Sequence, residues 1–347
     1  MGLRHPQDLE QWQRWERPSG IRRAVAAVRR RGRPAPTSDL RIVLPDGPAR
    51  LLVALDSATP SSRAAVLEPA RRLDQDHVAY LGPAGALERT GVAADASTAP
   101  VWDPEDPRLH RVERVLSIGA ALAAGHAACT WAAARGLDSV VVQHGLLTPW
   151  APPLPADTTL LSFTAEDGAF WASGRRDITV LPVGSQAMWE AAASARTPAT
   201  AGERPLVFLG QLHGRELPRR EIVGQTVRFL RRNPQAVYRP HPSETDLLSR
   251  AIHAAMQRSG TRFQETAVPL ARLQADAVSV FSTGVLEAAQ RGRRAWVHHD
   301  DPPPWLEEVW RRYGLARWGE EPTAPVRWSD REPAETVAEH LRTGEPR

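Results

Sequence analysis

Residues 277–289 read AVSVFSTGVLEAA, a run of five small or apolar residues followed by two hydroxyl side chains, a glycine and a helical pattern. The run at 277–281 predicts a strand that is buried on both faces. Ser282 or Thr283 can begin the helix predicted at 284–291, because a side-chain oxygen there accepts hydrogen bonds from the first helical N–H groups. A strand that leads directly into a helix is the repeating unit of a parallel α/β sheet.

The same alternation extends from this stretch toward both ends of the chain. Patterns typical of strands occur at 51–55, 77–81, 112–118, 139–142, 159–163, 178–183, 206–209, 236–239 and 294–298. Helical patterns lie between them, at 61–73, 120–135, 166–172, 186–193, 221–232 and 244–258. A segment rich in Ala, Thr and Gly, 194–204, separates two series. The sequence therefore predicts an α/β fold of two Rossmann-like domains that face each other across a cleft.

The length of the chain agrees with two domains, since 347 residues exceed one ordinary domain. We expect a basic arm and linker over 1–37 and a Rossmann-like domain over 38–195. A second Rossmann-like domain is expected over 196–330, with a C-terminal helix and tail over 331–347.

Composition narrows the class of protein. Hydrophobic residues make up 42% of the chain and charged residues 24%, as in soluble globular proteins. No run of about 18 apolar residues predicts a membrane span, and residues 1–6 lack the apolar core of a signal peptide. Cys129 is the only cysteine, which excludes a disulfide framework and a Cys-based zinc site and agrees with a reducing cytoplasm. The chain has no lysine, so a phosphate site must use Arg, His, hydroxyl and backbone N–H groups.

The net charge of +4 is distributed unevenly. Residues 1–36 hold nine arginines and three acidic residues, a net charge of +6, which leaves about −2 for the rest. This distribution excludes a general nucleic-acid-binding face. Arginines at 22–23 and 29–31 flank the apolar run 24–28. Such a segment forms either a helix that rests on anionic lipid at the inner face of the membrane or a solvated N-terminal helix.

The first candidate anion site follows the strand at 236–239. Ligands of parallel α/β sheets bind beyond the carboxyl ends of the strands, so polar residues at those ends carry the most information. In Arg239-Pro240-His241-Pro242 the two prolines fix the backbone around His241. If Ser243 or Glu244 starts the next helix, Arg239, His241 and that helix N-terminus together form an anion site.

The second candidate anion site is the Ser282-Thr283-Gly284 turn itself. Backbone N–H groups at the start of a helix can cradle phosphate, although ordinary helix capping by Ser or Thr needs no ligand. Glu287 lies one turn further along, within reach of a ribose hydroxyl. A carboxylate near a helix start is also favourable for dipole reasons alone.

A candidate general base follows the strand at 139–142. His144 is followed by Gly145, which permits a tight turn and the close approach of a substrate. Histidine titrates near neutral pH, as a general base requires, but a histidine that merely caps a turn would look the same in sequence.

Two further loops have weaker signals. Gly210, Gln211 and His213 follow the first strand of the second series and form either a loop near a donor or an ordinary turn. The letters of His298-His299-Asp300-Asp301 suit a metal, but neighbouring strand residues point to opposite faces and three prolines follow. We therefore expect a solvated loop there and no metal site.

The ordered set of motifs resembles the bacterial surface-polymer branch of the GT-B glycosyltransferases. This branch includes polysialyltransferase-like proteins, capsule glycosyltransferases and CDP-glycerol glycerophosphotransferases. The resemblance covers roughly residues 135–300. It implies that His241 with Ser282 and Thr283 binds the phosphate of a nucleotide-activated donor, and that His144 is the base. Sialyl and polysialyl enzymes instead carry an acidic motif as base, which Glu166-Asp167-Gly168 matches in letters. This motif opens a predicted helix, where acids are expected anyway, so we prefer His144 to Asp167.

The resemblance implies transfer of a sugar or polyol-phosphate unit from a CMP-, CDP- or UDP-linked donor to a hydroxyl of a polymer or lipid-linked acceptor. It implies a cytoplasmic enzyme that needs no cofactor and no metal. Two alternatives stay open. One is a nucleotide-sugar 2-epimerase on the same fold, which would need catalytic carboxylates and no separate acceptor. The other is a non-catalytic nucleotide-sugar-binding member of a polymer-assembly complex.

Overall fold

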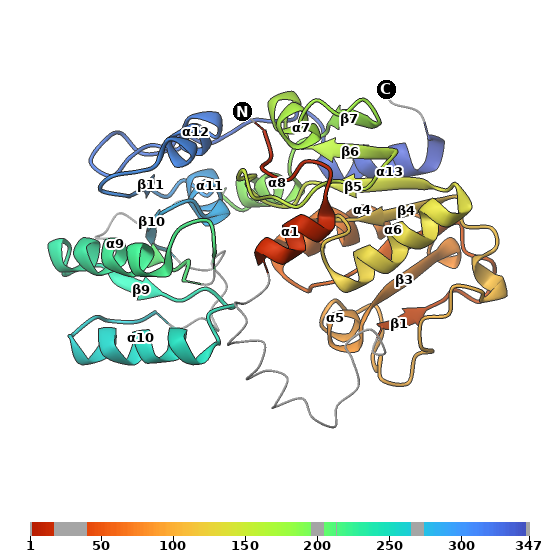
Figure 1. Cartoon of the computed structure of the whole chain (residues 1–347), viewed down its shortest axis with the longest axis horizontal. Helices are drawn as coiled ribbons and strands as arrows, with labels where there is room; N and C mark the ends of the chain where they lie inside the picture. Colours follow the sequence, from red (N-terminus) through yellow and green to blue (C-terminus); the bar gives the residue numbers. More distant parts are fainter. Residues whose placement is uncertain (1, 17–39, 196–204, 213, 265–273, 345–347) are drawn as a thin grey trace. The chain divides into compact units, whose positions relative to one another are not determined.

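The structure, a computed structural model, describes residues 2–16, 40–195, 205–212, 214–264 and 274–344. It divides into two compact units, one formed by residues 1–187 and 328–347 and the other by residues 188–327. Each unit has its own largely parallel sheet with helices packed on it (Figure 1). The predicted α/β class with two Rossmann-like parts is therefore confirmed. The division between the units falls inside the helix α8 (Gln186–Ser194).

The sheet of the first unit has seven strands in the order β1-β3-β2-β4-β5-β6-β7. All neighbours are parallel except β1, which is antiparallel to β3. The strands are β1 (Leu40–Val43), β2 (Leu51–Ala54), β3 (Val78–Pro83), β4 (Arg114–Ser117), β5 (Asp138–Val142), β6 (Thr158–Ser162) and β7 (Ile178–Pro182). The chain runs from β2 outward to β3 and then returns to β4, so the direction of winding reverses between β2 and β4. Ligands of such sheets bind at this reversal.

Helices cover both faces of this sheet, with α6 in front and α4 and α13 behind in Figure 1. Alternate strand residues pack into two cores, since Leu52 joins Trp131 of α6 and Val53 joins Val337 of α13. The helical segments are α1 (Leu9–Glu16), α3 (Pro60–Ser62), the π-helical turn η2 (Arg63–Leu67), α4 (Glu68–Ala70), η3 (Gln75–His77), α5 (Ala84–Arg89), η4 (Pro107–Leu109), α6 (Ala123–Arg135), α7 (Ala165–Ala172) and α13 (Pro333–Thr343).

The beginning of the chain differs from the predicted arm. Residues 2–16 pack on the first unit, where the Leu3 N–H donates to Ser173 Oγ at 2.8 Å. The indole N–H of Trp12 donates to the Trp150 carbonyl at 2.6 Å, and Trp15 stacks on the Trp150 ring. Residues 2–16 hold two arginines and three acidic residues, so the basic excess of the predicted arm lies in residues 17–36. The arginine clusters at 22–23 and 29–31 lie outside the described residues.

The sheet of the second unit has four parallel strands in the order β11-β10-β8-β9. Its strands are β8 (Leu206–Leu209), β9 (Val237–Arg239), β10 (Asp276–Ser279) and β11 (Ala295–Val297), and its helices besides the second part of α8 are α9 (Arg219–Arg232), α10 (Leu247–Arg258), α11 (Thr283–Gln290) and α12 (Pro304–Arg312). Its winding reverses between β8 and β10. The sheet is buried, with Phe208, Tyr238 and Val278 fully enclosed.

The start of α10 corrects the sequence prediction. We expected Ser243 or Glu244 to begin this helix, but it begins at Leu247 and Asp246 is its cap. Asp246 Oδ1 accepts from the N–H groups of Leu248 and Ser249 at 3.0 and 3.2 Å. Asp246 satisfies these amides, so the start of α10 adds nothing to an anion site at His241.

Among the described residues, no helix has the length and apolar character needed to cross a membrane.

Candidate functional site

Most of the residues predicted to bind the phosphate of the nucleotide-activated donor lie at the carboxyl ends of three strands in the second unit. Gly210 follows β8, Arg239 ends β9, and Ser282 comes shortly after β10. Because β8 lies between β9 and β10, the segments at Arg239 and Ser282 are two strand spacings apart, roughly 10 Å. This edge includes the reversal between β8 and β10, which is where a doubly wound sheet binds its ligand.

Hydrogen bonds tie these three strand ends together. The Gly210 N–H donates to the Arg239 carbonyl at 2.8 Å. Gln211 is buried, and its Oε1 accepts from the N–H groups of Val280 at 3.1 Å and Phe281 at 2.9 Å. The side chain of Gln211 thus fixes the backbone that precedes Ser282. His213, also predicted in this loop, lies outside the described residues.

Gly210 lies where a side chain would not fit. A Cβ atom there would be 2.3 Å from the Tyr238 hydroxyl and 2.7 Å from Glu244 Oε1. Both atoms are held by buried hydrogen bonds, the hydroxyl to Glu244 Oε2 and Oε1 to the Leu212 N–H, so they cannot move aside without cost. The glycine therefore allows the turn after β8 to lie directly on β9.

His241 is held in one orientation by its own turn. The Ser243 N–H donates to His241 Nδ1 at 3.1 Å, and the Glu244 N–H donates to the His241 carbonyl at 2.9 Å. Because Nδ1 accepts, the proton of the neutral ring is on Nε2, which makes Nε2 a donor for an anion. Burial lowers the pKa of His241, and the nearby charge of Glu244 partly opposes that shift.

Arg239 supplies a positive charge at the end of β9, two residues before His241. Its side chain is half-buried, and this burial lowers the pKa of the guanidinium. An arginine stays protonated across the physiological range even when its pKa falls. Partial burial thus strengthens the interaction of Arg239 with an anion without removing its charge.

Ser282 is the N-cap of α11, as the sequence predicted. Its Oγ accepts from the Gly284 N–H at 3.1 Å, and its own N–H donates to Ser279 Oγ at 2.8 Å. Ser282 and Thr283 are half-buried and Gly284 is buried. The positive end of α11 thus lies at the same edge as His241 and Arg239.

Glu287 lies on the second turn of α11 and faces Arg291, which is 3.3 Å away. Burial raises the pKa of Glu287, and Arg291 opposes that shift while Glu190 adds to it. The structure therefore shows an ion pair at Glu287. Its predicted contact with a ribose stays a prediction.

In the first unit, Gln143 organises the turn that carries His144. Gln143 is buried, and its Oε1 accepts from the Phe163 N–H at 2.8 Å. Its Nε2 donates to the Gly145 carbonyl at 3.0 Å and to Asp167 Oδ2 at 3.1 Å. One amide thus joins the ends of β5 and β6 to the first turn of α7.

His144 is half-buried, with Nδ1 enclosed and without a hydrogen-bond partner among the described residues. Burial lowers the pKa of His144 to about 4. The residue lines a cavity of about 20 Å³ together with Ser61, Ser185 and Gln186. At neutral pH its ring is uncharged and able to accept a proton.

Asp167 lies next to the His144 turn, but its side chain is completely buried. Its N–H donates to the Thr164 cap at 3.1 Å, as expected for the first turn of a helix. Because the Asp167 carboxylate has no exposed surface, an acceptor hydroxyl cannot reach it without a rearrangement of α7.

Sequence reasoning missed Asp56, which follows β2 at the reversal of the first sheet. Its carboxylate accepts from the Ala124 N–H at 2.7 Å and from the Gly125 N–H at 2.8 Å, at the start of α6. Burial raises the pKa of Asp56, and these two hydrogen bonds oppose the shift. The chain's own carboxylate thus occupies the α6 helix start, where a phosphate would otherwise bind. The sequence signal that could have identified Asp56 is its position directly after the apolar run 51–55, which was predicted to be a strand.

The loop at His298-His299-Asp300-Asp301 is solvated only in part, because Asp300 and Asp301 are exposed and His299 is not. His299 is buried, its Nε2 bonds to Glu221 Oε1 at 3.0 Å, and Asp300 pairs with Arg228 and Arg232. The α9 side chains that hold this loop are remote in sequence. Within the described part of the chain, no group of three or more His, Cys, Asp or Glu side chains could hold a metal ion.

No family model and no curated protein sequence matches the chain. Among solved structures it is similar to a Listeria monocytogenes protein assigned as a UDP-N-acetylglucosamine 2-epimerase, at 13% identity over 85% of this chain and 88% of that one, with a TM-score of 0.48. It is also similar to S. aureus MnaA in its co-structure with UDP, at 13% identity over 84% of this chain and 88% of that one, with a TM-score of 0.48. A third similar structure is the pneumococcal O-GlcNAc transferase GtfA in complex with UDP and GlcNAc, at 15% identity over 67% of this chain and 51% of that one, with a TM-score of 0.33. The fold assignment rests on the strand orders of the two units and not on these similarities.

Proposed function

We propose that the chain is a glycosyltransferase-like enzyme that moves a sugar or polyol-phosphate unit from a CMP-, CDP- or UDP-linked donor to an acceptor hydroxyl. The observation that carries the proposal is that Arg239, His241 and the start of α11 all follow the carboxyl ends of strands in one parallel sheet, beside a glycine where a Cβ atom would clash. A cation, a directed N–H donor and a helix N-terminus are the groups that bind phosphate.

In the proposed reaction, the residues that bind the donor phosphate offset the negative charge that develops on the leaving phosphate. His241 donates through Nε2, Arg239 contributes its charge, and the start of α11 contributes the Thr283 N–H and the hydroxyls of Ser282 and Thr283, since the Ser282 N–H is already bonded to Ser279 Oγ. Donors that are fixed before the reaction need no reorganisation during it, and such preorganised stabilisation is usually the largest contribution to catalysis. The bonds of Gln211 and Gly210 provide that fixation.

His144 is the proposed base for the acceptor hydroxyl. Its ring is neutral at physiological pH, as a base requires, and the burial that lowers its pKa to about 4 also makes it a weaker base than an exposed histidine. Complete burial of the Asp167 carboxylate favours His144 over Asp167 in this role. We further propose a polymer or lipid-linked acceptor in cell-surface polymer synthesis, on the inner side of the membrane.

A second candidate is the nucleotide-sugar 2-epimerase reaction, which Asp56 favours. This half-exposed carboxylate lies at the reversal of the first sheet and has a raised pKa, as an acid–base residue needs. An epimerase converts the nucleotide-sugar without an acceptor. NMR of UDP-N-acetylglucosamine incubated with the protein alone distinguishes the reactions, because a transferase leaves the configuration at the sugar's second carbon unchanged.

A thermal-shift screen with CMP, CDP, UDP, GDP and ADP tests the donor site. We expect one nucleotide class to raise the melting temperature, and we expect His241→Ala to abolish that shift. His144→Ala is the control, because it lies in the other unit and should keep the shift while losing turnover. If no nucleotide gives a shift, the proposed donor site is wrong. A shift without any turnover to lose would favour the non-catalytic alternative.

The peripheral membrane contact of residues 1–36 also remains a proposal. Since residues 2–16 pack on the first unit, the contact would be made by the arginine-rich remainder. Co-sedimentation with anionic and neutral vesicles tests it, with a variant that has glutamine in place of Arg22, Arg23, Arg29, Arg30 and Arg31 as comparison. Equal sedimentation with both kinds of vesicle would contradict a charge-driven contact.

A further inference from the structure

Glu244 is a completely buried carboxylate directly behind the candidate donor site. Its side chain has 0% relative exposure. Since α10 begins three residues later, Glu244 does not serve as a helix cap and turns inward instead. Burying a carboxylate is strongly unfavourable unless its oxygens are satisfied by donors, so both oxygens of Glu244 need hydrogen-bond partners.

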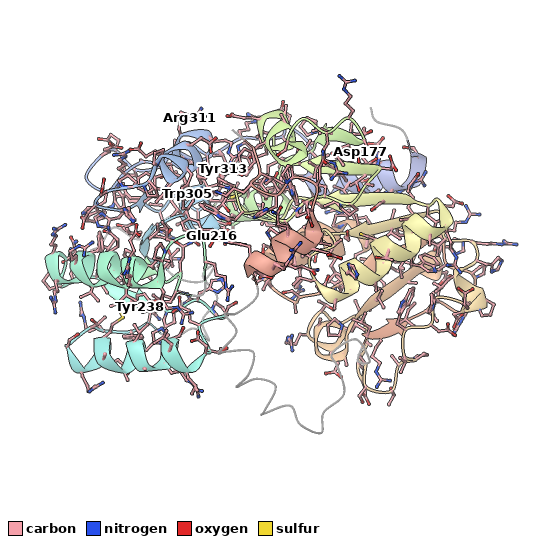
Figure 2. The ribbon with its side chains drawn as sticks, viewed as in Figure 1. Asp177, Glu216, Tyr238, Trp305, Arg311 and Tyr313 are labelled. Atoms are coloured by element: carbon pink, nitrogen blue, oxygen red, sulfur yellow. The ribbon has the colours of Figure 1, made fainter. Side chains whose placement is uncertain are left out.

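Three donors from three different elements converge on Glu244. Its Oε1 accepts from the Leu212 N–H, in the loop after β8, at 2.9 Å. Its Oε2 accepts from the Tyr238 hydroxyl of β9 and from His253 Nε2 of α10, both at 2.8 Å. Figure 2 shows Tyr238 between α9 and α10. The negative charge of Glu244 adds to the effect of burial in raising the pKa of the Tyr238 hydroxyl.

These bonds continue across the site to the start of α11. On one side, the Glu244 N–H holds the His241 carbonyl at 2.9 Å. On the other, Glu244 holds Leu212, whose neighbour Gln211 accepts from the N–H groups of residues 280 and 281 immediately before Ser282. A path of hydrogen bonds, joined by the peptide bond between Gln211 and Leu212, therefore runs from the His241 turn to the Ser282 turn, and Glu244 is its central link.

We infer that Glu244 is a positioning residue that sets the His241 turn, the loop after β8 and the start of α11 relative to one another. The inference rests on the proposed function. Glu244 does not touch the ligand, because it has no exposed surface. An apolar side chain would fill the same volume at lower desolvation cost, but it could not fix the Leu212 amide. Tyr238 and His253 hold the carboxylate in the orientation that this bond requires.

The test compares Glu244→Ala and Glu244→Gln with Asp276→Ala. Asp276 is a matched control: it is a buried carboxylate of the same unit, held by Arg294 at the opposite, amino end of β10. The probe is inorganic pyrophosphate, titrated by calorimetry well below the melting temperature of each variant. Pyrophosphate reports on the phosphate site without contributions from base or sugar.

We expect Glu244→Ala to weaken pyrophosphate binding at least tenfold. Glu244→Gln should restore most of the affinity, because a glutamine oxygen can still accept from Leu212 while its amide donates to Tyr238 and to the other tautomer of His253. Asp276→Ala should lower stability and leave the affinity unchanged. Wild-type affinity in Glu244→Ala, or an equal loss in Asp276→Ala, would overturn the inference.

Hydrogen exchange separates this inference from the proposed function. Glu244→Ala should speed exchange at the Leu212, Val280 and Phe281 amides more than elsewhere in the second unit. If exchange changes in this way but the wild-type protein binds neither pyrophosphate nor any nucleotide, the positioning role stands and the proposed function fails. If exchange at these amides is unchanged, the positioning role is wrong whatever the protein binds.

Discussion

At the scale of single residues, Gly210 shows how closely the candidate donor site is packed. A Cβ atom in Gly210→Ala would lie 2.3 Å from the Tyr238 hydroxyl and would push it away from Glu244. We expect a loss of about 1–3 kcal/mol in the free energy of unfolding, which urea titration measures. Gly224→Ala is the control: its Cβ would meet only the flexible end of Arg228, and alanine favours the helix α9 by up to about 1 kcal/mol. Equal effects of the two substitutions would contradict the packing argument.

The protonation of His144 gives a second prediction. Its pKa is about 4 in the folded protein against an ordinary value of 6.5, so between these pH values the unfolded chain binds more protons. The resulting stabilisation is complete above pH 6.5 and is lost as the pH falls toward 4. At 1.36 kcal/mol per pKa unit, it amounts to at most about 3 kcal/mol.

Urea unfolding of the wild type and of His144→Gln between pH 7.5 and 4.5 measures this contribution. It is the difference between the two proteins in how steeply the free energy of unfolding changes with pH. The comparison is necessary because burial also lowers the pKa of His241 and His298. An NMR titration of the His144 ring is the direct check, and a midpoint near 6.5 would show that the ring is not desolvated.

At the scale of elements, α1 is attached to the first unit mainly through Trp12, which is 7% exposed. Trp12→Ala should destabilise the first unit by about 3–5 kcal/mol, because it removes a large buried side chain. Trp12→Phe keeps an aromatic ring and loses the hydrogen bond to the Trp150 carbonyl, which costs about 1 kcal/mol. Heat unfolding compares the two variants. If Trp12→Ala unfolds like the wild type, α1 is not part of the folded unit.

The elements also show how much of the fold could be predicted. Strands such as β5 and helices such as α6 were predicted to within a few residues, because buried apolar runs and helical periodicity are local signals. The strand β1 was missed: it is four residues long, and its pairing with β3 is a tertiary contact. The start of α10 was misplaced because Asp246 competes successfully as the cap and Glu244 becomes buried.

The candidate site follows the same rule. The sequence predicts which residues follow strands, since this depends only on strand position, and His144, His241 and Ser282 do lie after β5, β9 and β10; their roles stay predictions. It does not predict what a side chain meets across the sheet. The bridging roles of Gln143 and Gln211, the inward turn of Glu244 and the burial of His299 all depend on elements remote in the chain. These roles become apparent only once the strand order is known.

At the scale of the whole molecule, the two compact units draw their buried side chains from different parts of the chain. One core of the first unit is completed by α13 from the C-terminus, where Leu341 is 6% exposed and packs with strands β2 to β6. Gln186 fastens the start of this helix, since its Oε1 accepts from the Ala334 N–H at 3.0 Å. The core of the second unit lies entirely within residues 188–327. Units with separate cores can unfold in separate transitions.

Calorimetric unfolding tests this independence. Leu341→Ala should lower the free energy of unfolding of the first unit by about 2–5 kcal/mol and leave that of the second unit unchanged. The control is Arg342→Gln, at an exposed position, which should change neither free energy by more than about 0.5 kcal/mol. Gly210→Ala should lower only the transition of the second unit. A nucleotide at a hundredfold excess over its Kd should raise that same transition by about 2.7 kcal/mol. If nucleotide instead stabilises the transition that Leu341→Ala lowers, the first unit contains the nucleotide site, and the assignment of His241 and Ser282 as donor residues must be abandoned.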